Sequence, residues 1–229
     1  VCDHTMKQVQ PERPREIPIA AVRPRGDVRE RLIGAESIDA LRQGAVVGTS
    51  SPRRAAQLRS IRPDLEIVPL RGNVDTRLSK VEDGEVDATL LCSAGLRRLG
   101  KPDVGVPIPV EVLLPAPAQA VIGVECRSDD AITAAVLTII DDRSTHAAIG
   151  IERAFAHALG ATCHSPVAAL ATLDNGKMRL RAQLLSEDGA EQISDEALFE
   201  CSDLEGPRAF ARAMLVRAPE AVRRLFEQG

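Results

Sequence analysis

The sequence predicts an α/β fold built around a mostly parallel sheet. Between positions 45 and 99, apolar segments of strand length alternate with helical segments, which is the order that right-handed strand-helix-strand crossovers produce. The chain has 229 residues and is 44% apolar, enough to bury roughly two compact cores or one large one. This composition excludes a disordered chain and a small disulfide-stapled scaffold.

The elements follow one another from a Pro-rich start. Four prolines within residues 10–30 predict a connector there. The alternating part then begins with an apolar strand that ends at Gly48. In order, we predict strand 45–48, helix 52–60, strand 65–70, helix 74–81, strand 86–92 and helix 94–99.

Two prolines, Pro115 and Pro117, end the alternating part. A buried strand at 121–126 and helical stretches at 129–140 and 145–159 follow. Strands at 167–173 and 178–185 form a predicted hairpin, because Asp174-Asn175-Gly176 between them is a strong turn signal. We predict that one long amphipathic helix at 206–227 closes the chain.

Composition excludes several functional classes. The net charge is −4, and the four Phe that make up the whole aromatic content lie in the last third of the chain, so a nucleic-acid surface is not expected. No apolar run reaches the roughly 18–20 residues that span a bilayer, and no signal peptide is evident, so we expect a cytoplasmic protein without a membrane contact. The five Cys are widely spaced and predict free thiols, and the four scattered His predict no metal site.

The segment from Gly48 to Arg54 is the most informative. Thr49 and Ser50 follow the strand end, Ser51 can cap the next helix, and Pro52 suits its first position. Arg53 and Arg54 then lie in the first turn, where positive charges interact unfavourably with the helix dipole unless an anion pairs with them. The turn predicts a receptor for carboxylate or phosphate. A solvated basic turn is the alternative.

Further arginines follow neighbouring strands. Arg71 and Gly72 come directly after strand 65–70, Arg77 lies about one helical turn later, and Arg97 and Arg98 follow strand 86–92. Open α/β sheets bind ligands at the carboxyl ends of their strands. We therefore predict that these side chains converge on a small polyanionic ligand.

Two other positions are candidates. Cys163 lies in the polar loop 160–166 next to a His, so it is either a small buried residue or a functional thiol. Lys7 is one of only four lysines, and its alternative interpretation is an ordinary surface cation.

Together these segments resemble the porphobilinogen deaminases, also called hydroxymethylbilane synthases. The resemblance covers essentially the whole chain, and the double-Ser, double-Arg and Arg-Gly-Asn motifs are specific to that family. The matching segments are 48–54, 70–78, 87–88, 94–100, 114–116, 123–127, 152–155 and the loop of Cys163.

The resemblance implies an enzyme of tetrapyrrole and haem biosynthesis. It implies that four porphobilinogen units are joined head to tail into linear hydroxymethylbilane with release of ammonia, on a dipyrromethane cofactor bound covalently to Cys163. Each pyrrole carries acetate and propionate groups, so the chain is a polycarboxylate. The residues implied to hold the cofactor are Thr49, Ser51, Arg53, Arg54, Arg71, Gly72 and Arg77, and Lys7 and Arg98 are implied to lie nearer the incoming porphobilinogen.

The family fold implies two lobes like those of periplasmic binding proteins and a C-terminal α/β domain that carries the cofactor Cys. Mapped onto this sequence, residues 21–111 form the second lobe and residues 142–229 the C-terminal domain. Residues 1–20 and 112–141 would be a remnant of the first lobe and its hinges, most of that lobe being absent. The family implies a monomer.

Two departures from the family pattern bear on activity. Gln8 stands where the family has the catalytic Asp, and a neutral amide cannot offset the cation formed when ammonia leaves. Ala flanks both sides of Gln119, where the family commonly has Gly on at least one side, so we expect a stiffer hinge. We therefore expect weak or absent turnover. The alternative is a non-catalytic two-lobed binding protein for an organic polyanion.

Overall fold

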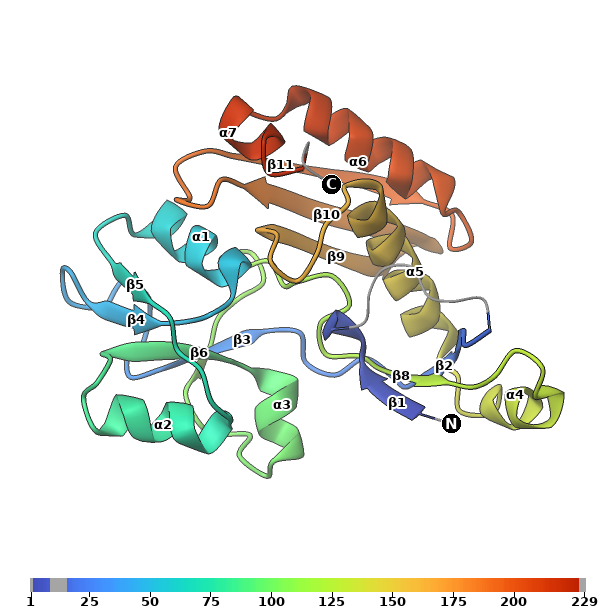
Figure 1. Ribbon diagram of the computed structural model, residues 1–229, viewed down its shortest axis with the longest axis horizontal. Coiled ribbons are helices and arrows are strands. Elements are labelled where there is room, and N and C mark those ends of the chain that lie inside the picture. The colour runs from blue at the N-terminus through green and yellow to red at the C-terminus, as the bar shows by residue number, and fades with distance from the viewer. Residues whose placement is uncertain (1, 9–15, 227–229) are drawn as a thin grey trace.

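The computed structural model describes residues 2–8 and 16–226, apart from the side chain of Gln8. The described chain forms three sheets, and helices lie both between the sheets and on their outer faces (Figure 1). An α/β fold is therefore confirmed. The strand orders are β5-β4-β6-β3-β7 in the five-stranded sheet, β1-β8-β2 in the small sheet and β11-β10-β9 in the C-terminal sheet.

The five-stranded sheet carries the Arg-rich segments. β4 (Val46–Gly48) lies parallel to β5 (Glu66–Val68) and to β6 (Ala88–Cys92). β3 (Glu30–Ile33) and β7 (Val106–Pro107) extend this sheet in antiparallel pairing. The prediction of a mostly parallel sheet is therefore wrong, because β3 enters from the small sheet and runs against β6.

Three helices begin at one edge of this sheet, as predicted. α1 (Pro52–Ile61), α2 (Val74–Glu82) and α3 (Ser93–Arg98) follow β4, β5 and β6 in turn. Ser51 caps α1 by accepting from the Arg54 amide, and Asn73 caps α2 by accepting from the Thr76 amide. These strands are parallel neighbours, so their carboxyl ends lie together and so do the helix starts.

The small sheet pairs strands from the start of the chain with a strand that ends at Glu125. β8 (Ile122–Glu125) pairs on one side with β1 (Cys2–Thr5) and on the other with β2 (Ile19–Val22). The short 3-10 helix η1 (Met6–Gln8) follows β1, and α4 (Ala131–Leu137) packs near β2. The predicted connector at 10–30 is wrong over Ile19–Val22, because four apolar residues between prolines are enough for a short edge strand.

The C-terminal unit has one sheet with helices on one face. β9 (Val167–Asp174), β10 (Lys177–Leu185) and β11 (Gln192–Phe199) form an antiparallel meander, and α5 (Arg143–Ala158) contributes the fully buried Phe155 to its core. The hairpin turn is confirmed, with positive φ at Asn175 and Gly176.

Two features of this unit differ from expectation. The strand β11 was not predicted, because its residues alternate between exposed and half-buried without a strong apolar pattern. The long helix expected at 206–227 is wrong: α6 (Glu205–Arg217) ends before Ala218, whose backbone is extended, and the short α7 (Glu220–Arg223) begins after Pro219. A proline disfavours helical backbone at the residue before it.

No helix in the described part of the chain is long and apolar enough to cross a membrane.

Candidate active site

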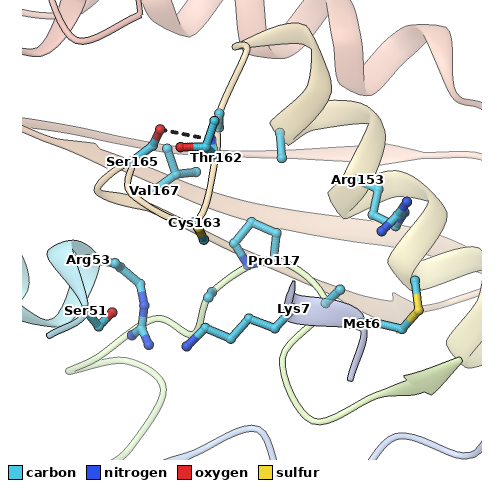
Figure 2. A pocket seen from close by; sticks show the side chains of 14 residues that line it. Met6, Lys7, Ser51, Arg53, Pro117, Arg153, Thr162, Cys163, Ser165 and Val167 are labelled. Atoms are coloured by element: carbon cyan, nitrogen blue, oxygen red, sulfur yellow. Dashed lines mark hydrogen bonds between the residues drawn. The ribbon is translucent and has the colours of Figure 1, made fainter. Parts of the chain in front are cut away.

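A cavity of about 220 Å³ lies where the three sheets meet. It is lined by η1, the start of α1, residues 116–118, α5 and the loop before β9 (Figure 2). Three of the described lining residues are cationic, namely Lys7, Arg53 and Arg153, and none of them is acidic. The cavity therefore favours an anionic occupant.

Cys163 is an exposed free thiol at this cavity. Two hydrogen bonds to side chains help to hold its loop, from the Thr162 amide to Ser165 Oγ (3.0 Å) and from the His164 amide to Thr162 Oγ1 (3.2 Å). In Figure 2 the Cys163 sulfur points into the space between Arg53 and Pro117. Of the two interpretations left open by the sequence, the buried small residue is excluded.

Arg53 is almost completely buried, with 2% of its surface exposed. Its Nη2 donates to Glu30 Oε1 (2.5 Å), and its Nη1 donates to Gln57 Oε1 and to the Leu114 carbonyl (both 3.0 Å). Its Nε is buried and has no hydrogen-bond partner among the described residues. An unpaired buried donor is costly, so this N–H is suited to an acceptor brought by a ligand.

Arg54 is held by the same carboxylate. Its Nη2 donates to Glu30 Oε2 (2.6 Å) and its Nε to Glu30 Oε1 (3.0 Å), while Nη1 donates to the Leu90 carbonyl (2.8 Å). The anion that pairs with both arginines at the start of α1 is thus Glu30, a residue of the chain itself. Glu30 was not predicted, because no motif or spacing links it to α1.

Glu30 is completely buried on β3. Burial alone would raise the pKa of its carboxyl, but the positive charges of Arg54 and Arg53 hold that pKa well below its usual value. Glu30 is therefore an anion at neutral pH. It holds both guanidinium groups in place, although their positive charges repel each other.

Lys7 lies in η1 at the same cavity and is half-buried. Burial, together with the charges of Arg54 and Arg53, lowers the pKa of Lys7 to about 7. Its amine is therefore close to half protonated at neutral pH. Such a group can take up or release a proton within the working range of an enzyme.

A second cavity of about 270 Å³ is lined by Arg54, which follows Arg53 in α1. Arg77 and Gly72 line it, and Arg77 Nε donates to the Gly72 carbonyl (2.9 Å). Gly72 has a φ of +123°, and an added Cβ would lie 2.8 Å from Thr76 Cγ2, so this turn requires glycine.

Seven of the predicted site residues line one of the two cavities. Lys7, Ser51, Arg53 and Cys163 share the first cavity, and Arg54, Gly72 and Arg77 share the second. Thr49 is buried, and its Oγ1 accepts from the Ser51 amide (3.2 Å), so it shapes the turn. Arg71 and Arg98 are exposed and line neither cavity, and the side chain of Gln8 lies outside the described part of the structure.

The segment around Gln119 connects these groups. Ala118 and Ala120 have φ values of +57° and +65°, a left-handed backbone that costs alanine roughly 1–2 kcal/mol per residue. Buried carboxylates hold the segment in place: Glu152 Oε2 accepts from the Ala118 amide (2.6 Å), and Glu30 Oε1 accepts from Gln119 Nε2 (3.0 Å). The departure from the family pattern is therefore a strained one.

Comparison with known proteins agrees with this geometry. The family model "Porphobilinogen deaminase, dipyromethane cofactor binding domain" matches residues 1–135, and "Porphobilinogen deaminase, C-terminal domain" matches residues 147–213. The porphobilinogen deaminase of Sphingopyxis alaskensis is 47% identical over 99% of this chain, which covers 73% of that protein. Those of Paracoccus denitrificans and Roseiflexus sp. are 45% and 44% identical over 96% and 81% of this chain, covering 69% and 62% of each relative. The chain therefore belongs to the porphobilinogen deaminase family.

Proposed function

We propose that the chain acts as a hydroxymethylbilane synthase, a transferase of tetrapyrrole biosynthesis that joins porphobilinogen units and releases ammonia, with Cys163 as the attachment point of its dipyrromethane cofactor. The observation that carries this assignment is the exposed Cys163 thiol at a cavity with three cationic and no acidic described lining residues. A carboxylate-rich pyrrole group tethered at Cys163 would lie in the same cavity as these cations.

The residues present fit that cofactor. Arg53 offers its unpaired Nε, Ser51 lines the same cavity, and Arg54 and Arg77 line a second cavity. When bound, the group supplies the pyrrole position at which the growing chain is extended. Exposed Arg71 and Arg98 are proposed to contact carboxylates of the chain or of incoming porphobilinogen.

The charged groups of the site are already in place before a carboxylate ligand binds. Glu30 keeps the Arg53 and Arg54 guanidinium groups in fixed positions, so little rearrangement is needed when carboxylates arrive. Lys7 Nζ, with a pKa of about 7, is proposed to exchange a proton close to the amine that leaves as ammonia.

Gln8 ends η1, directly after Lys7, and its side chain lies outside the described part of the structure. An amide at this position can accept a pyrrole N–H bond but supplies no negative charge. We therefore propose that this chain binds cofactor and substrate, and that its turnover is limited at Gln8.

The predicted domain boundaries are kept as part of this proposal. Strands of the five-stranded sheet lie between positions 30 and 107, within the proposed lobe 21–111. The C-terminal sheet and its helices lie within 142–229, and β1, β8 and α4 lie within 1–20 and 112–141. Monomeric state and cytoplasmic location stay predictions.

Intact-mass measurement tests the cofactor assignment. Protein made in cells with active haem synthesis is expected to carry a dipyrromethane adduct, and Cys163→Ala is expected to abolish it. Cys2→Ala, which removes another exposed free thiol, is the matched control and should keep the adduct. An unmodified mass for correctly folded protein would refute the cofactor assignment and favour a binding protein.

A further inference from the structure

The turn between β10 and β11 lies directly on α1 (Figure 1). Gly189 in this turn has a φ of +72°, and a Cβ added there would lie 2.3 Å from the Ala56 carbonyl oxygen and 2.8 Å from the Ser60 amide nitrogen. Both atoms belong to the backbone of α1, which cannot rotate aside as a side chain can. Arg59 Nη1 of the same helix donates to the Glu187 carbonyl (3.0 Å). The C-terminal sheet and the helix of the Arg-rich segment therefore meet backbone to backbone.

The turn is shaped by its own hydrogen bonds. Ser186 is buried, and its Oγ donates to Asp188 Oδ1 (2.6 Å) and accepts from the Glu191 amide (3.0 Å). Asp188 Oδ1 also accepts from the Ala190 amide (3.0 Å), and the Gly189 amide donates to the Ser186 carbonyl (3.0 Å). These bonds fix the shape of the turn, so it presents Gly189 to α1 as a preformed surface.

Buried side chains extend this contact to Arg53. Gln57 of α1 is 2% exposed, and its Nε2 donates to Gln183 Oε1 on β10 (2.8 Å) and to the Leu114 carbonyl (3.0 Å). Gln57 Oε1 accepts from Arg53 Nη1 (3.0 Å). A continuous chain of hydrogen bonds thus runs from the C-terminal sheet through Gln57 to the Arg53 guanidinium.

The first cavity depends on how these two parts of the chain lie together. Cys163 is on the loop that leads into β9, and β9 is paired with β10 along its length. Arg53 lies in the first turn of α1, after β4 of the five-stranded sheet. Both residues line the same cavity. Any shift of α1 against β10 would therefore change the position of Arg53 relative to Cys163.

We propose that the β10–β11 turn docks on α1 and holds Arg53 in the same cavity as Cys163, with Gln57 as the positioning residue that connects the two. Docking keeps a guanidinium charge close to the thiol. For the reaction, the contact decides whether a group attached at Cys163 reaches Arg53. That consequence rests on the proposed function, whereas the docking itself does not.

Gly189→Ala tests the docking, because it adds the methyl group that the α1 backbone excludes. Gly176→Ala is the matched control: Gly176 is in the other hairpin of the same sheet, its φ is +83°, and a Cβ there meets nothing within 4 Å. Both variants place alanine at a positive φ, so they differ in the contact with α1. Gln183→Ala is a second test variant, which removes the bond to Gln57 without straining the backbone.

The assay compares alkylation of Cys163 by iodoacetate and by iodoacetamide at low ionic strength. The protein is made in cells blocked before porphobilinogen, so that the thiol is free, and peptide mass spectrometry gives the rate at each Cys. Both reagents respond to the exposure and ionisation of the thiol, but only the anionic reagent responds to positive charge near it. The ratio of the two rates at Cys163, divided by the same ratio at exposed Cys2, therefore reports that charge.

Gly189→Ala and Gln183→Ala are expected to lower this ratio about twofold to fivefold, as for removal of one nearby unit charge, and Gly176→Ala to leave it unchanged. A fall in either test variant beyond that of Gly176→Ala supports the docking. An unchanged ratio in both test variants, or an equal fall in Gly176→Ala, would overturn it. The assay does not depend on the cofactor: a missing mass adduct would refute the proposed function alone, whereas an adduct with an unaltered ratio would refute the docking alone.

Discussion

Glu30→Gln is the most direct test of how the site is held together. Glu30 is completely buried and accepts four hydrogen bonds, from Arg53 Nη2, Arg54 Nε, Arg54 Nη2 and Gln119 Nε2. The substitution keeps the shape but removes the negative charge, so two buried guanidinium groups lose their counterion. Removing one partner of a buried ion pair typically costs about 3–5 kcal/mol.

The loss is to be measured by urea unfolding at neutral pH, with Glu85→Gln as the control. Glu85 pairs with Lys80 on the surface and is 55% exposed, so its loss should cost no more than about 1 kcal/mol. If Glu30→Gln were to cost as little as this surface control, the reasoning that Glu30 supports the arginines would be refuted.

The pH dependence gives a second readout of the same variant. The pKa of Glu30 in the folded chain lies below the ordinary value of 4.5. Its stabilising effect is therefore complete above about pH 4.5 and is lost as the pH falls through the folded pKa. The stability of Glu30→Gln should fall less steeply than that of the wild type below pH 4.5. Because Glu30 also raises the pKa of Lys7, that pKa should drop below 7 in the variant.

Three further outcomes are expected. The pKa of Lys7 is about 7 in the folded chain and has an ordinary value of 10.5, so between these pH values the unfolded chain binds more protons and stability rises with pH. Lys7→Met should flatten this rise. An unchanged dependence of the unfolding free energy on pH, measured by urea titration, would contradict this. Ala118→Gly should leave stability almost unchanged, because relief of the positive φ offsets the lost methyl group, whereas Ala148→Gly in α5 should cost about 1–2 kcal/mol; equal losses in thermal unfolding would argue against strain. Gln8→Asp should raise the rate of hydroxymethylbilane formation, and an unaltered rate would show that Gln8 is not limiting.

Local sequence patterns were sufficient for the elements that carry the cofactor motifs. Ser51 and Pro52 predict the start of α1, Asn175 and Gly176 predict the hairpin, and alternation predicts β4 to α3. These signals are local, since capping and turn geometry depend on residues within one turn. The antiparallel placement of β3 and the existence of β11 could not be read this way, because pairing direction depends on distant partners.

By itself, the sequence determined the family, the Arg-rich helix starts and the identity of Cys163 as the candidate attachment point. Only the tertiary structure decided which arginines face which cavity. It pairs Glu30 with both Arg53 and Arg54 and brings Lys7, Arg53 and Cys163 to one cavity. These contacts join residues far apart in the chain, and no local periodicity records them. The clustering of arginines in the sequence therefore predicts a basic site, whereas burial and the position of Glu30 decide how much of that positive charge is available to a ligand.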